Sequence, residues 1–329
     1  MLVQDDILSL TAARFPQNAD SPSDVIPLEK GGSDRKFHRI RNGGNSMIFI
    51  KYSAQKEENR HYVHIARFLA SAGVPVPGVF EHDPDEGLIW MQDMGDDDLW
   101  SYRNEPWSIR RPLYESTLDA VLAMHTTATV AATGEDLHLE RVFDADLYHW
   151  EQGYFFDNCL GTHFGMSAPA LESLRSLPAL HDASDRLASL PRVLVHRDFQ
   201  SQNVMIQHGR AWLIDFQGMR FGLPQYDLAS LLHDPYAGLA EEEKCELLEY
   251  YKSRLGATGG KVESDFDTVF DWCSVQRLMQ ALGAYGFLGH HKGRPEFLTH
   301  IPAARASLYR IASRLDDLEP LVNKLDSLP

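Results

Sequence analysis

The protein has 329 residues, of which 43% are hydrophobic and 24% charged, a composition typical of folded globular proteins. This length suffices for one large domain or two lobes, with a substantial buried core. The chain carries 31 Lys and Arg against 47 Asp and Glu, a formal net charge of −16. Such an acidic surface repels the phosphate backbone of nucleic acids and anionic lipids, so neither is expected as a partner.

The three cysteines, Cys159, Cys245 and Cys273, are odd in number and widely spaced, and no CxxC pair occurs. This pattern argues against a disulfide framework or a zinc site and favours a reducing compartment. The N-terminal residues lack the basic and apolar regions of a secretory signal, and no apolar run reaches the roughly 18 residues that span a bilayer. We therefore expect a cytoplasmic protein.

The N-terminal part of the chain, residues 1–94, shows both strand and helix signals. Residues 36–51 predict a β-hairpin whose turn is the Asn-Gly-Gly-Asn sequence at 42–45. A helix is predicted from about residue 56 to 72, because its apolar residues recur at helical spacing and a glycine follows them. Short strands are predicted at residues 79–81 and 88–92.

Long amphipathic stretches dominate the remainder of the chain. The predicted helices cover residues 109–127, 145–159, 168–190, 241–255, 266–287 and 301–318. A strand-rich island interrupts them, with strands predicted at residues 193–195, 204–206 and 211–214 and a tight turn at His208-Gly209.

These elements predict an α+β protein with two lobes. The small N-terminal α/β lobe, residues 1–94, would contain an antiparallel sheet, and the larger lobe, residues 95–329, would be mainly helical and hold the catalytic loop and the substrate site. The hinge falls near residues 92–95. Because ligand sites favour clefts between lobes, we expect the functional site there.

The strand-rich island contains the segment His196-Arg197-Asp198-Phe199-Gln200-Ser201-Gln202-Asn203, and Asp215 follows a predicted hairpin. This spacing matches the kinase pattern H-R-D-x-x-x-x-N followed by a magnesium-binding Asp. Phosphoryl transfer needs a carboxylate to take the proton of the acceptor hydroxyl and oxygen ligands to hold magnesium on the phosphates. A hairpin would bring Asn203 and Asp215 to the same end, within reach of one metal ion. The composite pattern favours this interpretation over turn or capping roles for the aspartates.

These residues resemble the aminoglycoside phosphotransferase and choline kinase superfamily, whose fold is protein-kinase-like. Phe216-Gln217 after Asp215 differs from the Phe-Gly of protein kinases, and the segment from Gly222 to Ala229 resembles the one that follows the metal-binding Asp in small-molecule kinases. Within the superfamily, the chain is most similar to bacterial kinases that phosphorylate the anomeric hydroxyl of N-acetylmuramate and N-acetylglucosamine. The segments that carry this resemblance are Gly32-Ser33-Asp34-Arg35-Lys36-Phe37, Asp215-Phe216-Gln217, Gln276-Arg277 with Leu282-Gly283-Ala284, and His300-Ile301-Pro302.

The resemblance implies a role for each residue that matches the family pattern. Asp198 would be the catalytic base, and Asn203 and Asp215 would hold magnesium. Lys51, near the end of the second hairpin strand, would contact the α- and β-phosphates of ATP. ATP and magnesium are therefore the expected cofactors.

The resemblance also implies roles around the nucleotide and the catalytic loop. Gly31-Gly32-Ser33 takes the place of a Gly-rich loop, where Ser33 would donate a hydrogen bond to a phosphate. Gln92 to Met94 would offer backbone groups to adenine. His196 would support the catalytic loop, and Asp227, at the start of a helix, would brace the loop's backbone.

For the acceptor, the resemblance implies contacts from Gln217, Gln276 and Arg277. Gln217 stands beside the metal site and can hydrogen-bond a hydroxyl, and Arg277 can pair with a carboxylate in bidentate fashion. Gln276 and Arg277 fall in a predicted helix, so the alternative is that they belong to an exposed polar face.

Three functions stay open from the sequence. The first is an ATP-dependent kinase for the anomeric hydroxyl of an N-acetylated amino sugar in cell-wall recycling, working as a monomer or weak dimer upstream of a nucleotidyltransferase. The second is a kinase of the same fold for an aminoglycoside, choline, homoserine or another sugar, and the negative net charge favours a cationic acceptor. The third is a pseudokinase that binds nucleotide without transfer, against which the intact Asp198, Asn203, Asp215 and Lys51 argue.

Overall fold

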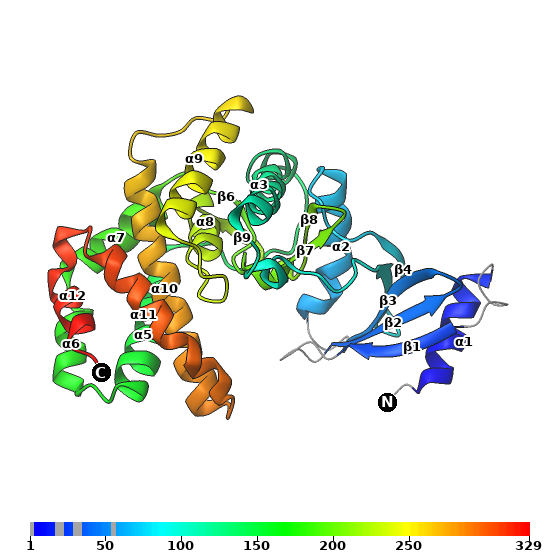
Figure 1. Ribbon diagram of the computed structural model, residues 1–329, viewed down its shortest axis with the longest axis horizontal. Coiled ribbons are helices and arrows are strands. Elements are labelled where there is room, and N and C mark those ends of the chain that lie inside the picture. The colour runs from blue at the N-terminus through cyan, green and yellow to red at the C-terminus, as the bar shows by residue number, and fades with distance from the viewer. Residues whose placement is uncertain (1–2, 17–22, 29–34, 54–56) are drawn as a thin grey trace.

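The computed structural model describes residues 3–16, 23–28, 35–53 and 57–329, and it shows an antiparallel sheet at one end of an elongated molecule and helices over the rest (Figure 1). The N-terminal elements are α1 (Gln4–Arg14), β1 (Ser23–Leu28), β2 (Lys36–Asn42), β3 (Asn45–Lys51), α2 (Glu57–Ser71), β4 (Val79–Asp83) and β5 (Leu88–Gln92). The strands pair antiparallel in the order β1-β2-β3-β5-β4. The predicted α+β fold class is confirmed.

The predicted hairpin is present as β2 and β3, with Asn42 opposite Asn45. The two glycines between them have φ values of 52° and 97°, the left-handed region that a two-residue hairpin turn requires. The helix α2 and the strands β4 and β5 also lie where they were predicted. The sequence did not single out α1 or β1. β1 contains Pro27, which lowers its strand signal and is tolerated because β1 is an edge strand.

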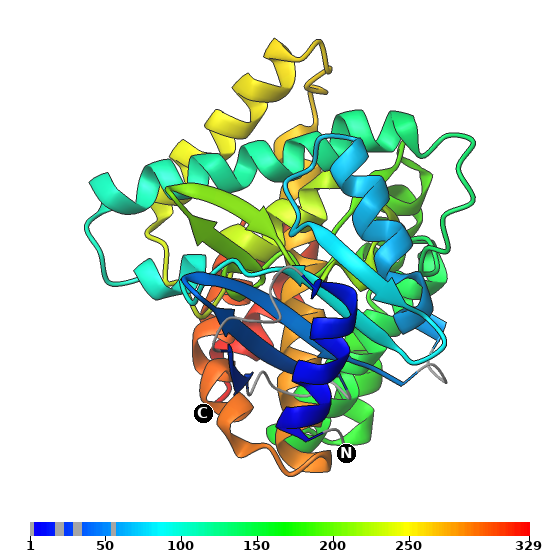
Figure 2. The same cartoon turned by 90° about the vertical axis from the view of Figure 1, so that its right-hand side faces the viewer.

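The two faces of the sheet have different partners, which decides what can reach the site. One face packs against α1, which lies across it in Figure 2. The apolar cluster on this face consists of Ile7, Ile40, Phe49, Leu88 and Trp90. The opposite face contributes Ile50 and Met91 to a larger core that includes residues of α2. Because side chains alternate along a strand, Lys51 belongs to the α1 face together with Phe49.

The C-terminal part is built from helices around a small group of strands. The helices are α3 (Trp107–Ala123), α4 (Thr129–Ala131), α5 (Ala145–Phe155), α6 (Ala168–Arg175), α7 (Pro178–Ser189), α8 (Pro224–Leu232), α9 (Glu241–Ala257), α10 (Phe266–His291), α11 (Ile301–Ala312) and α12 (Glu319–Asp326). The strands β6 (Val193–Val195) and β9 (Arg220–Gly222) pair with each other, as do β7 (Val204–Gln207) and β8 (Arg210–Leu213). The helix α10 packs against α5, α8 and α11. In the described parts of the chain, no helix is long and apolar enough to cross a bilayer.

Two predicted helices are wrong in their extent. Residues 168–190 form α6 and α7, not one helix, because Pro178 begins a new helix and leaves Leu177 extended, with φ −62° and ψ 117°. The helix predicted at 301–318 ends at Ala312, and the chain then turns so that α12 packs back on α11. The strand β9 was missed because its residues, Arg-Phe-Gly, include only one apolar side chain and no β-branched residue, unlike the Val-Leu-Val of β6. The lobe boundary predicted after residue 94 falls between β5 and the next 3-10 helix, Leu99–Tyr102, and stays a prediction.

Close packing of α10 against the π-helical continuation of α5 (Phe156–His163) generates a stability prediction. A side chain at Gly286 would overlap the Asn158 carbonyl, whereas one at Gly256 of α9 would meet nothing within 4 Å. We expect Gly286→Ala to lower the free energy of unfolding by about 1–3 kcal/mol through overpacking. The matched change Gly256→Ala should alter it by less than about 1 kcal/mol, towards stability. Urea denaturation measures both, and equal midpoints would contradict this account of the helix contact.

Candidate active site

The β7–β8 hairpin brings together the residues that flank it, Asn203 and Ile214. Its strands pair with Val204 opposite Leu213, and His208 and Gly209 form the turn with φ values of 53° and 73°. At the open end, the Ile214 amide donates a hydrogen bond of 3.0 Å to the Asn203 carbonyl. Asn203 and the residue after Ile214, Asp215, therefore lie side by side at the edge of the cleft.

Asp198 lies in the loop between β6 and β7, and its carboxylate is partly open to solvent. The Arg197 guanidinium donates to it at 2.5 Å, and the Asn203 side-chain amide donates to the Asp198 backbone carbonyl at 2.8 Å. Burial would raise the pKa of the Asp198 carboxyl, but the positive charges of Arg197 and Arg277 outweigh it and hold the pKa below its usual range. Asp198 is thus a carboxylate at neutral pH, able to accept a proton.

The backbone of this loop is hydrogen-bonded to the side chain of Asp227 in α8. Its fully buried carboxylate accepts hydrogen bonds from the backbone amides of His196, at 2.7 Å, and Arg197, at 2.8 Å. The His125 imidazole contacts the same carboxylate at 3.1 Å. Arg197 has φ 74°, a conformation that costs a non-glycine residue about 1–3 kcal/mol and that these bonds offset.

Two further contacts tie the loop to its surroundings. The buried His196 ring donates from Nε2 to the Ile214 carbonyl at 2.8 Å, which links the loop to the segment that carries Asp215. The buried carboxylate of Asp234, just after α8, accepts from the Ser201 amide at 2.9 Å and the Ser201 hydroxyl at 2.5 Å. Both ends of the loop are therefore fixed to buried groups.

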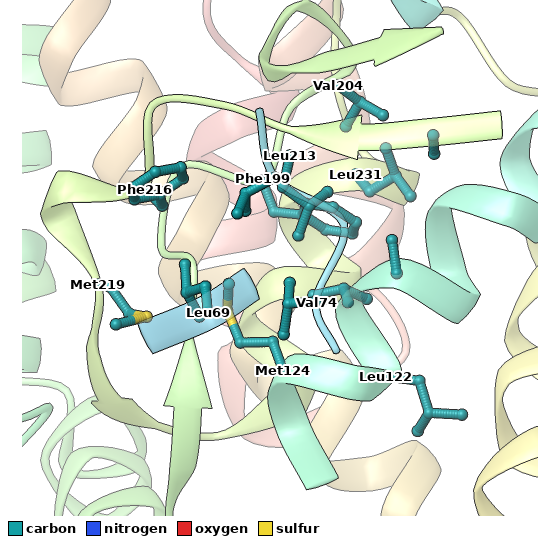
Figure 3. Packing of buried hydrophobic residues seen from close by; sticks show 14 of the residues in the cluster. Leu69, Val74, Leu122, Met124, Phe199, Val204, Leu213, Phe216, Met219 and Leu231 are labelled. Atoms are coloured by element: carbon teal, nitrogen blue, oxygen red, sulfur yellow. The ribbon is translucent and has the colours of Figure 1, made fainter. Parts of the chain in front are cut away.

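Apolar side chains anchor the residues that follow the two aspartates. Phe199 and Phe216 are fully buried in the large core, where they gather with Leu69 of α2 (Figure 3). The Phe216 ring also stacks on Tyr62 of α2, with 5.1 Å between centroids. The two phenylalanines therefore fix the segments that carry Asp198 and Asp215 to the core.

A cleft of about 630 Å³ lies between the sheet and the β7–β8 hairpin, a size suited to a small-molecule ligand. The predicted site residues Gln92, Met94, Asn203, Asp215 and Gln217 all line it. Apolar walls come from Leu28, Phe37, Ile48 and Met91 of the sheet. The Gly31–Ser33 segment, including Ser33, lies outside the described residues.

The donor set at the cleft edge fits a magnesium ion that also binds phosphates. The Asn203 amide nitrogen is used by the Asp198 carbonyl, so its oxygen is left for a ligand beside the Asp215 carboxylate. Magnesium keeps waters and phosphate oxygens and needs only one or two protein oxygens. In the described parts of the chain, no group of three His, Cys, Asp or Glu residues could form a protein-only cage.

The structure does not bring Lys51 and Gln276 to the cleft. The Lys51 ammonium donates to the Glu86 carbonyl on the α1 side of the sheet. The Gln276 side chain is buried between α5 and α10, where its oxygen accepts from Gln152 at 2.7 Å and its nitrogen donates to the Tyr148 carbonyl at 3.2 Å. The sequence periodicity showed that both lie in regular elements but could not show which face they occupy.

Arg277 is buried beneath the catalytic loop. Its guanidinium donates to the Ser230 hydroxyl at 3.0 Å and to the Gln280 side-chain oxygen at 2.6 Å. The alternative, an exposed polar face, is therefore wrong for Arg277. Its contribution to the site is the charge that helps to lower the pKa of Asp198.

Arg39, which the sequence analysis did not single out, joins the sheet to the hinge. Its guanidinium donates to Asp93 at 3.0 Å, to Asp96 at 2.6 Å and to the Gly95 carbonyl at 2.9 Å. Burial opposes the charge of Arg39, but Asp93 and Asp96 outweigh it and raise its pKa. The signal that could have identified Arg39 is its place on β2, two residues after Phe37 on the cleft face of a strand.

A carboxylate base, an adjacent amide–carboxylate pair and a ligand-sized cleft, on a fold with a hinge between sheet and helices, define a kinase of the phosphotransferase type. The sequence matches the Phosphotransferase enzyme family (APH) over residues 24–266, and the chain belongs to this family. It is accordingly a small-molecule kinase that uses a hydroxyl group as acceptor.

Similar proteins cover nearly the whole chain. An N-acetylmuramate/N-acetylglucosamine kinase of Pseudomonas aeruginosa is 26% identical over 317 residues, 94% of this chain and 89% of that protein. A kinase of the same name from Neisseria meningitidis is 25% identical and covers 87% of this chain and 85% of that one. The ADP-bound crystal structure of aminoglycoside phosphotransferase APH(2'')-Ib superposes with a TM-score of 0.61 and 12% identity, covering 92% of this chain and 97% of that one. This superposition confirms the predicted protein-kinase-like fold.

The charge environment of Asp198 generates a pH prediction. Arg197→Gln removes the largest charge that lowers the pKa of Asp198, so that pKa should rise. Because the protonated carboxyl cannot accept a proton, kcat should then fall at a higher pH on the acid side than in the wild type. The measurement is kcat against pH, with the surface variant Arg186→Gln as control. An acid limb at the wild-type pH in Arg197→Gln would contradict the assigned interaction.

Proposed function

We propose that the protein transfers the γ-phosphoryl group of ATP, with magnesium, to the anomeric hydroxyl of N-acetylmuramate or N-acetylglucosamine in cell-wall recycling. The transfer chemistry is supported by one arrangement: Asn203 and Asp215 line a ligand-sized cleft, and the Asn203 side chain donates to the backbone carbonyl of Asp198. The acceptor is supported by the names of the Pseudomonas and Neisseria relatives, which match over most of their length.

Each residue of this chain has a defined part in the proposed reaction. Magnesium-bound ATP supplies an activated γ-phosphoryl group. Asn203 and Asp215 would hold the metal. The hinge from Gln92 to Met94 would position the adenine of ATP. Asp198 takes the proton of the anomeric hydroxyl while that oxygen bonds to the γ-phosphorus, and the bond from this phosphorus to the β–γ bridging oxygen breaks to release ADP.

Gln217 is the best-placed side chain for the acceptor. It belongs to the short helix Phe216–Gly218, whose last residue lies against Asp198, since a Cβ at Gly218 would be 3.8 Å from the Asp198 carboxylate. Its buried side-chain oxygen lines the cleft and has no hydrogen-bond partner among the described residues. An acceptor hydroxyl would satisfy this oxygen.

The acceptor is tested by ADP release in the presence of magnesium and ATP. The panel is N-acetylglucosamine, N-acetylmuramate, glucose, galactose, choline, homoserine and kanamycin. We expect turnover to concentrate on the two N-acetylated sugars, with loss of their reducing-end signal because the anomeric hydroxyl becomes a phosphate ester. Turnover on another acceptor, or intact reducing ends after ADP release, would overturn the assignment of the acceptor.

The assignment of the base is tested with Asp198→Asn. The amide keeps the shape of the side chain but cannot accept the proton, so kcat should fall by about 100- to 10,000-fold. ADP affinity, measured by calorimetry, should stay within about threefold of the wild type because the metal ligands and the hinge are unchanged. Retained turnover in Asp198→Asn would show that another group accepts the proton.

A further inference from the structure

The polyphosphate of a bound nucleotide needs a positive side chain near Asp215, an inference that rests on the proposed ATP-dependent function. The phosphates carry dense negative charge, which magnesium neutralises only in part. This chain has a net charge of −16, so its overall field opposes a polyphosphate and a local cation must compensate. The sequence resemblance assigned this role to Lys51.

The fold of the sheet removes Lys51 from this role. Lys51 is the last residue of β3 and shares its face with Phe49, which packs into the α1 cluster. Its ammonium is bonded to the Glu86 carbonyl in the turn between β4 and β5. The residues of β3 on the cleft side are Ser46, Ile48 and Ile50, and none of them carries a positive charge. For Lys51 to reach the cleft, β3 would have to shift its register by one residue, which would turn Phe49 out of its core.

Three of the described residues that line the cleft carry a full positive charge: Arg35, Arg39 and Arg294. Arg39 is held at the hinge by Asp93 and Asp96, where the base of a nucleotide would lie. Arg294 follows α10, packs over Phe297 with 4.5 Å to the ring centroid and pairs with Glu296 at 3.0 Å. Both guanidinium groups are therefore already engaged by neighbouring carboxylates.

Arg35 lines the same cleft as Asp215 and is linked to the segment of Asp215 through Tyr62. It directly precedes β2, and its guanidinium carbon lies 5.8 Å from the centroid of the Tyr62 ring. Tyr62 stacks on Phe216, the residue after Asp215. Tyr62 itself lines the cleft together with Arg35 and Asp215. The contacts from Arg35 to Tyr62 and from Tyr62 to Phe216 therefore place Arg35 at the end of the cleft that carries Asp215.

We propose that Arg35, and not Lys51, is the cation that binds the nucleotide phosphates, with the ring of Tyr62 supporting its guanidinium. A guanidinium at this point can donate two parallel hydrogen bonds to phosphate oxygens, and Asp215 would hold magnesium. The aromatic ring favours a cation over it and limits the freedom of the long side chain. The phosphate-binding charge of this kinase thus enters from the start of β2 instead of from β3.

The test compares Arg35→Met and Arg35→Lys with the matched control Lys51→Met, by calorimetric titration of ADP and of adenosine with magnesium present. Arg35→Met should weaken ADP by about 10- to 100-fold and leave adenosine within about twofold, because only the phosphate contacts are lost. Arg35→Lys keeps the charge without the planar fork, so its ADP affinity should be intermediate. Lys51→Met should bind both ligands like the wild type.

The outcomes separate this inference from the proposed function. Loss of ADP affinity in Lys51→Met, or wild-type ADP affinity in Arg35→Met, would overturn the role of Arg35. Equal weakening of adenosine and ADP in Arg35→Met would show a folding defect instead of a phosphate contact and would also count against it. If the wild type binds ADP but phosphorylates none of the sugars, the proposed acceptor fails while the role of Arg35 stands.

Discussion

The active site depends on one buried carboxylate that accepts two consecutive backbone amides. Asp227 bonds the amides of His196 and Arg197, and a third donor comes from His125. An unpaired carboxylate at full burial would be very costly, so the three donors and Asp227 hold one another in place. These bonds hold Arg197 in a left-handed conformation, and Asp198 is the next residue of the same loop. A helix that follows the loop in sequence thus fixes the backbone beside the base.

The second half of the site depends on a hairpin and on two phenylalanines. The hairpin places Asn203 and Asp215 at one end, and the burial of Phe199 and Phe216 in a shared core fixes the orientation of each segment. The side chains of Asn203 and Asp215 line the cleft, and the phenylalanine after each aspartate packs in the core. The same core includes residues of α2 and of the sheet, so the packing that stabilises the catalytic segment also joins it to the nucleotide cleft.

Charge organises this acidic protein through local pairs. Arg197 and Arg277 keep Asp198 ionised although burial opposes its charge. Arg39 donates hydrogen bonds to both Asp93 and Asp96 at the hinge, where the sheet meets the rest of the chain. The net charge of −16 therefore says little about the cleft, where Asp93 and Asp96 bond Arg39 and Asp98 accepts from Ser101.

The sequence by itself determined the local features: the β2–β3 hairpin from its glycines, most helices from their periodicity, and the grouping of Asn203 with Asp215 from a short hairpin. These depend on residues that are close in the chain, where spacing alone fixes geometry. The start of α7 at Pro178 and the end of α11 at Ala312 were missed. Where a helix is interrupted within an amphipathic stretch also depends on the elements that pack against it. Only the tertiary structure decided that Lys51 faces α1, that the Gln276 side chain is hydrogen-bonded between α5 and α10, and that Arg35 lines the cleft. Those outcomes depend on which face of a strand or helix meets a distant element, and a linear pattern does not contain that information.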